Sequence, residues 1–347
     1  MSSTSARERH RDFYLAKVKQ APMDWQQIEK IYGQIKLAWT RQIERHPKDV
    51  VLLDFIWTLH IYQERRGLWA DYLNWAEHGL KLAQFQEQHK DVAPLLNNIG
   101  LAYSDLGDMQ QALDFYNQAL PLTRQVGDID GEATTLNNIG VVYSDLGDMQ
   151  QALDFYNQAL PLTRQVGDIS GEGTILNNIG VVYLALDDQE QALNFFDQDL
   201  RLKRQVGDIS GEATALTNIG VVYSKLGDMQ QALDFYNQAL PLTRQVGDRT
   251  GEAATLNNIG LVYSDLDDMQ QALDFYNQAL PLYRQVGARW KERITLVNMA
   301  VCYADMGDLD AVEELLLQTV ALDKAIGHPD LESDKKVLAE IQALRQQ

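Results

Sequence analysis

Residues 136–175 read LNNIGVVYSDLGDMQQALDFYNQALPLTRQVGDISGEGTI, and the same forty-residue block recurs in phase from Leu96 to about Arg293. A degenerate copy follows it. One unit of this size cannot bury its own apolar face, so a fixed period indicates a single supersecondary unit stacked on itself. The sequence therefore predicts an elongated array in which each repeat packs on its neighbours.

Each block predicts a helical hairpin. Leu136, Ile139 and Val142 recur at helical spacing, Gly147-Asp148 interrupts them, and the spacing resumes from Ala152. Gly147 is placed to end the first helix in left-handed geometry, and Asp148 is placed to cap the second. The second helix also holds a proline in four copies, where we expect a bend. These prolines are Pro121, Pro161, Pro241 and Pro281.

The copy that begins at Ala133 resembles the tetratricopeptide repeat (TPR) at its signature positions. These positions are Leu136, Ile139, Gly140, Tyr143, Ala152, Tyr156 and Ala159. The forty-residue length resembles the variety found in kinesin light chains. The resemblance implies an all-α fold, a right-handed superhelical solenoid of helical hairpins closed by helical caps.

The register predicts the domain organisation. Five regular repeats fill residues 93–292, a degenerate sixth follows at 293–332, and a divergent first repeat occupies 53–92. We expect residues 1–52 to form a helical cap region and residues 333–347 to form a capping helix.

The amino-terminal ninety residues differ in composition from the repeats, because they hold five of the six tryptophans. The segments RHRDFYLA at 9–16 and LLDFIWTLHIYQERRGLWADYLNWAEHGLKLA at 52–83 resemble the TPR sensor arm of bacterial STAND-type regulatory NTPases. The phosphate-binding pattern GxxxxGK[ST] does not occur in the chain, so no sequence motif supports NTPase activity in this chain.

Composition limits the partners. The net charge is -19, from 30 basic and 49 acidic residues, which argues against nucleic acid and anionic membranes. The only cysteine, Cys302, excludes an intrachain disulfide and is expected to be a buried structural thiol. We find neither a signal-peptide h-region nor a long apolar run, so we expect a soluble, cytoplasmic chain.

Catalytic patterns are missing from the sequence. None of the six histidines lies between residues 90 and 327, and neither HExxH nor GxSxG occurs. The sequence therefore predicts a protein that is not an enzyme and needs no cofactor or metal.

In the TPR family the first helix of each hairpin lines the concave groove, and the resemblance carries this role onto matching positions here. The predicted lining residues are Asn97, Leu101, Asp105, Asn137, Val141, Ser144, Asp145, Asn177, Val181, Leu184, Thr217, Val221, Lys225, Asn257, Leu261 and Asp265. Asparagine amides both donate and accept, so this first asparagine series suits the backbone of an extended peptide.

A second asparagine series is present in all six repeats and is expected to make structural bonds between repeats. Its members are Asn98, Asn138, Asn178, Asn218, Asn258 and Asn298. A row of acids, Asp105, Asp145, Asp265 and Asp305, is either a solvated rim or a field that favours a basic or neutral ligand. Lys225 interrupts this row.

The third repeat departs most from the others. Asp199 occupies a packing position, and we expect Lys203, one turn along, to pair with it. Leu184-Ala185 adds an apolar step, which is either a specificity pocket or sequence drift.

Three hypotheses of function remain. The first is a non-catalytic scaffold whose groove binds a protein or extended peptide. The second is the ligand-sensing arm of a STAND-type switch whose NTPase module is not in this chain. The third is head-to-tail self-assembly into a homo-oligomer, because like surfaces repeat in register.

Overall fold

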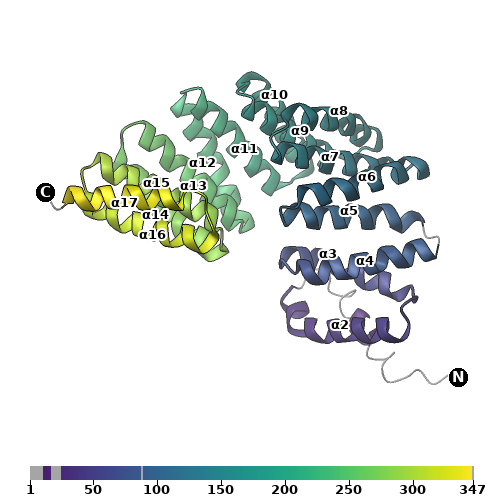
Figure 1. Ribbon diagram of the computed structural model, residues 1–347. Coiled ribbons are helices and arrows are strands. Elements are labelled where there is room, and N and C mark those ends of the chain that lie inside the picture. Colours follow the sequence, from purple (N-terminus) through teal and green to yellow (C-terminus); the bar gives the residue numbers. More distant parts are fainter. Residues whose placement is uncertain (1–10, 17–24, 87–88, 346–347) are drawn as a thin grey trace. The chain divides into compact units, whose positions relative to one another are not determined.

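The computed structural model describes residues 11–16, 25–86 and 89–345, and these residues form helices joined by short turns (Figure 1). Residues 1–10, 17–24 and 346–347, which belong to the predicted caps, lie outside the described residues. The chain divides into two units, Met1–Gly167 and Asp168–Gln347, and each is considered by itself.

The first unit pairs its helices along the chain. After a helical segment at residues 11–16, it contains α2 (Trp25–Arg45), α3 (Val51–Arg65), α4 (Trp69–Phe85), α5 (His89–Asp105), α6 (Met109–Val126), α7 (Ile129–Asp145) and α8 (Met149–Val166). In each hairpin we call the first helix the A helix and the second the B helix.

The second unit continues the same alternation. It contains α9 (Ile169–Ala185), α10 (Gln189–Val206), α11 (Ile209–Lys225), α12 (Met229–Val246), α13 (Arg249–Asp265), α14 (Met269–Val286), α15 (Arg289–Asp305), α16 (Leu309–Ile326) and α17 (Leu331–Arg345). Each A helix packs on its own B helix, and successive A helices also contact one another. The all-α solenoid of helical hairpins is therefore confirmed.

The predicted helix ends are also confirmed. Gly147 follows the end of α7 with a left-handed φ of 82°, which an L side chain adopts only with strain, and Gly167 ends α8 in the same way with a φ of 74°. The Asp148 carboxylate accepts from the backbone N–H of Gln151 at 3.1 Å, and the Gln151 side chain donates back to it at 2.7 Å. α8 continues through Pro161, whose ring is exposed.

Close packing within a hairpin depends on a glycine. A Cβ added at Gly140 would lie 2.5 Å from Cε1 of Tyr156, so only glycine lets the A helix approach this ring. Tyr156 and Ala152 are fully buried, whereas Tyr143 is half-buried and stacks on Phe155 with centroids 5.4 Å apart. The signature residues therefore form the A–B interface.

The amino-terminal helices replace this small-residue packing with large rings. Trp39 of α2 stacks on Trp75 of α4 with centroids 4.3 Å apart, and Phe55 of α3 packs edge-on against both. Both tryptophans are 2% exposed. Two of the five tryptophans of this region therefore form part of a core.

Candidate functional site

One face of each A helix carries the side chains that packing leaves accessible. On α7, Thr134, Asn138, Val141 and Asp145 follow one another at helical spacing and are exposed or half-exposed. We define the A-helix face by three such positions: a second-series asparagine, the aliphatic residue three places on, and the residue four places beyond that.

The face has an asparagine and an aliphatic residue in each of the six repeats between residues 93 and 332, and its third position varies. In the first unit it comprises Asn98, Leu101, Asp105, Asn138, Val141 and Asp145. In the second unit it comprises Asn178, Val181, Ala185, Asn218, Val221, Lys225, Asn258, Leu261, Asp265, Asn298, Val301 and Asp305.

The first asparagine series points instead at the next repeat. Asn97 is buried, and its Nδ2 donates to Oγ1 of Thr135 at 2.8 Å. In the equivalent pair the direction is reversed, and the Thr295 hydroxyl donates to Oδ1 of Asn257 at 3.0 Å. The hydroxyls of Thr217 and Thr255 are 3.2 Å apart. Each bond joins residues 38 positions apart, so this series holds consecutive A helices together.

Where the partner hydroxyl is missing, the bond changes partner. Ala215 stands at the position of Thr135, and Asn177 accepts instead from Nδ2 of Asn218 at 2.8 Å. Ile175 also stands at the position of Thr135, one repeat later. Nδ2 of Asn137 lies 3.4 Å from Oδ1 of Asn138. We expected the second series to make the bonds between repeats, but the first series makes most of them.

The aliphatic residues predicted to line the groove do lie on the A-helix face. Val181 and Leu261 are 41% and 42% exposed, while Leu101, Val141 and Val221 are half-buried. Two other predicted residues do not belong to it. Leu184 is half-buried and packs beside the core cluster around Phe196 and Leu216, and Ser144 is half-buried between the core and the face.

Charged residues occupy the carboxyl end of the face. Asp105 and Asp145 are surface residues, yet desolvation at the helix end raises the pKa of both carboxyls. Lys225 and Asp265 stand at the matching places in the second unit and are exposed. The charge of this position therefore varies while its location does not.

The third repeat buries an acid without a full partner. Asp199 is 1% exposed, its Oδ1 has no hydrogen bond, and burial raises its pKa to about 7. The expected ion pair with Lys203 does not form, because Nζ of Lys203 lies 3.4 Å from Oδ2 of Asp208 instead. The charge of Lys203 still lowers the pKa of Asp199 in part.

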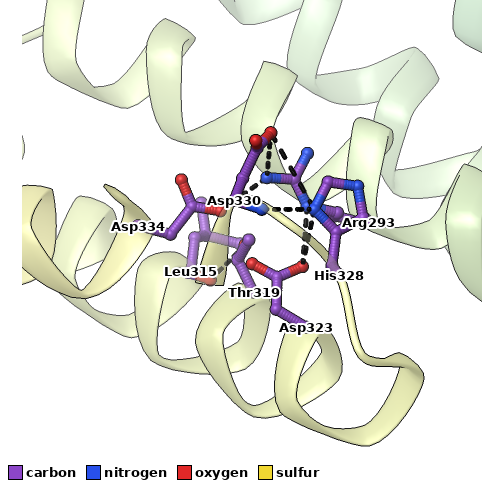
Figure 2. Close-up of polar contacts among 7 residues, drawn as sticks. All are labelled: Arg293, Leu315, Thr319, Asp323, His328, Asp330 and Asp334. Carbon is purple, nitrogen blue, oxygen red and sulfur yellow. Dashed lines mark hydrogen bonds and ion pairs between the residues drawn. The ribbon is translucent and has the colours of Figure 1, made fainter. Parts of the chain in front are cut away.

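A polar cluster that we did not predict joins the last three helices (Figure 2). Arg293 of α15 donates to Asp323 of α16 at 2.7 Å, and to Asp330 and Asp334 at 3.3 and 2.6 Å. Asp330 lies just before α17, and Asp334 lies within it. His328 accepts the backbone N–H of Asp330 at 3.1 Å. Three carboxylates surround one guanidinium, so the cluster holds α15, α16 and the start of α17 together.

A depression of about 410 Å³ lies between α2 and α4 in the first unit. Trp39 and Trp75 form its floor, and Lys36 pairs with Asp71 at 2.6 Å along its wall. One face of each indole is covered by the other, and both tryptophans are only 2% exposed, so this depression offers a ligand little aromatic surface and an already paired charge.

Groups suited to chemistry are scarce among the described residues. In that part of the chain no cluster of three or more His, Cys, Asp or Glu side chains could hold a metal ion. Cys302 is fully buried, as expected, and burial raises the pKa of its thiol. None of the described helices combines the length and apolar character needed to cross a membrane.

Comparison with known proteins places this geometry in a family. The family model for the tetratricopeptide repeat matches residues 56–125, 131–205 and 211–285. No curated protein matches the chain in sequence.

Several solved structures share the fold. A Rap protein complexed with Competence and Sporulation Factor gives a TM-score of 0.66 at 14% identity, over 98% of this chain and 89% of that one. Apo RapI gives 0.64 at 15% identity, over 79% of this chain and 98% of that one. The STAND protein PH0952 from Pyrococcus horikoshii, which has a tetratricopeptide repeat sensor, gives 0.63 at 15% identity. It is matched over 96% of this chain and 50% of that one. The expected likeness to such sensor arms is thus confirmed for the fold.

Proposed function

Because the chain belongs to the tetratricopeptide repeat family, whose model matches more than half of its length, we propose that it is a non-catalytic scaffold that binds an extended segment of a partner protein on the A-helix face. The observation that carries this proposal is the second asparagine series. Within the described residues, the half-exposed side chains of Asn98, Asn258 and Asn298 make no hydrogen bond. Their amides are therefore available to a ligand.

The chemistry of the face suits a peptide backbone. Each amide can donate to a carbonyl and accept from an N–H, whatever side chains the peptide carries. Packed helices lie roughly 8–10 Å apart, and an extended chain advances about 3.3 Å per residue. Successive asparagines would then meet every third residue of the ligand, while the exposed aliphatic residue beside each asparagine receives apolar side chains.

The fold neighbours are consistent with this use. One of them, the Rap protein, was solved in complex with Competence and Sporulation Factor. At 14% identity the likeness extends to the fold alone, so the asparagine series of this chain carries the proposal.

A selection from a random dodecapeptide display library on the full chain tests it. We expect enriched peptides whose affinity, measured by calorimetry, falls about tenfold in Asn98→Ala/Asn138→Ala or in Asn258→Ala/Asn298→Ala, because two backbone hydrogen bonds are lost. Asn237→Ala/Asn277→Ala is the matched control, since both of these residues are exposed on B helices. If no peptide is enriched, or if neither face variant changes affinity, the proposal fails.

The second candidate function is the sensor arm of a STAND-type switch. The observation that favours it is the match to PH0952, which covers 96% of this chain but only half of that protein. The native reading frame tests it: a phosphate-binding loop encoded in frame upstream of Met1 supports this function, and a stop codon directly before Met1 rules it out.

A further inference from the structure

The charge at the carboxyl end of the A-helix face changes sign within the second unit. Lys225 ends α11, Asp265 ends α13, and Asp305 ends α15. All three side chains are exposed, and in the described part of the chain none of them is in an ion pair. The successive A helices that carry them contact one another (Figure 1). The unit therefore presents one positive and two negative charges in a fixed order.

These charges lie on the surface already assigned to peptide binding. Each of them follows an asparagine and an exposed or half-buried aliphatic residue on the same helix face, as Asn258 and Leu261 precede Asp265. The helix dipole disfavours an acid at a helix carboxyl end, so Asp265 and Asp305 do not serve helix stability there. Both carboxylates remain available to a cation supplied by a ligand.

We propose that the A-helix face of the second unit selects a partner segment by its charge order: an extended stretch with one acidic residue opposite Lys225 and basic residues opposite Asp265 and Asp305. This inference rests on the proposed function and names the partner class for the same face. Neighbouring helices are roughly 8–10 Å apart and an extended chain rises about 3.3 Å per residue. The ligand residues that lie opposite the three charges are therefore about three positions apart in the ligand sequence. The recognised pattern is acidic-x-x-basic-x-x-basic, with aliphatic residues between the charges to meet Val221 and Leu261.

Exposure to solvent limits how much these ion pairs contribute to the charge preference. An exposed ion pair changes affinity only a few-fold, so three matched pairs are worth about tenfold over three mismatched ones. Salt screens such pairs over about 10 Å at 0.1 M and about 3 Å at 1 M. The preference should therefore shrink at high salt, while the part of the affinity that comes from asparagine and aliphatic contacts persists.

Labelled synthetic peptides and the full chain test the inference by fluorescence anisotropy. The probe carries Glu-Ala-Val-Lys-Ala-Val-Lys between Gly-Ser flanks, a second probe carries the same pattern in the opposite chain direction, and each has a partner with every charge reversed. We expect the wild-type chain to bind one probe about tenfold more tightly than its charge-reversed partner. Lys225→Glu/Asp265→Lys/Asp305→Lys should invert this preference.

The control variant makes matched charge changes off the face. Arg201, Asp234 and Asp274 are exposed on the B helices α10, α12 and α14, and Arg201→Glu/Asp234→Lys/Asp274→Lys should leave the preference as it is in the wild type. The inversion also separates the second unit from the first, whose face is unchanged in every variant. Equal binding of a probe and its charge-reversed partner, or binding of neither, overturns the inference. The asparagine face would still stand if the display selection yields peptides that depend on it.

Discussion

Asp199 shows how one residue can lower the stability of an otherwise regular repeat. The other four regular repeats have alanine there, as in Ala159 and Ala239, and these alanines are fully buried. Gly173 replaces a further alanine opposite it, and a Cβ at Gly173 would lie 2.7 Å from Oδ1 of Asp199. The two departures of the third repeat are therefore coupled, because the glycine makes room for the carboxylate.

We predict that Asp199 makes stability depend on pH. Burial raises its pKa to about 7 in the folded chain, against 3.8 in an unfolded one. Folding therefore favours the protonated acid, and the stabilisation is complete below pH 3.8 and is lost as pH rises toward 7. A shift of about three pH units corresponds to roughly 4 kcal/mol.

Urea unfolding at pH 5 and pH 8 measures this effect. Asp199→Ala should raise the free energy of unfolding more at pH 8 than at pH 5. Asp197→Ala, which removes an exposed acid from the same helix, should change both values alike. An equal gain from Asp199→Ala at the two pH values would contradict the prediction.

At the scale of the helix, side-chain hydrogen bonds between residues 38 positions apart join consecutive A helices, and we call each such bond a tie. The tie requires a hydroxyl in the next repeat, as between Asn257 and Thr295, whose single hydroxyl hydrogen is shared between Oδ1 of Asn257 and the backbone oxygen of Lys291. Thr295 is fully buried, so removing Asn257 loses the hydrogen bond between the repeats, while the hydroxyl keeps the backbone oxygen of Lys291 as its acceptor. The neighbouring Asn258 faces outward and makes no such bond.

We therefore predict opposite consequences for two adjacent asparagines. Asn257→Ala should lower the free energy of unfolding by about 1–2 kcal/mol and should couple with Thr295→Ala in a double-mutant cycle. Asn258→Ala should change stability by less than about 0.5 kcal/mol. Thermal melts of the four variants check this, and a larger loss at Asn258 would show that the ties have been assigned to the wrong series.

The adjacent asparagines also mark the limit of what the sequence could predict. The period identified the hairpins, the caps at Gly147 and Asp148, and the outward aliphatic positions such as Val141, because helical spacing and turn residues determine these. Asn97 and Asn98 are only one position apart on the helix. Which of them meets the next repeat depends on how the helices cross, and a periodic pattern does not contain that information.

The whole chain has the energetics of an array in which each repeat is stabilised by its neighbours. Damage should therefore stay near its source rather than unfold everything at once. The end of the second unit also departs from the repeat pattern, because Arg293 and Asp323 replace the residues found at Ala253 and Thr243. The Arg293 cluster joins three helices, and no spacing rule within one repeat could predict it.

We predict that Arg293→Ala loosens only the end of the array. Asp323 is completely buried, so losing its guanidinium partner should cost about 3–5 kcal/mol. Hydrogen exchange should accelerate in α16 and α17 while α11 and α12 keep their protection. Arg293→Ala/Asp323→Thr restores the residues of a regular repeat, so α16 should regain protection in this variant. α17 should still exchange faster than in the wild type, because its bond from Arg293 to Asp334 is gone. If the double variant fails to restore α16, the loss does not come from a buried unpaired charge, and if α11 also loses protection, the array does not behave as a chain of nearest neighbours.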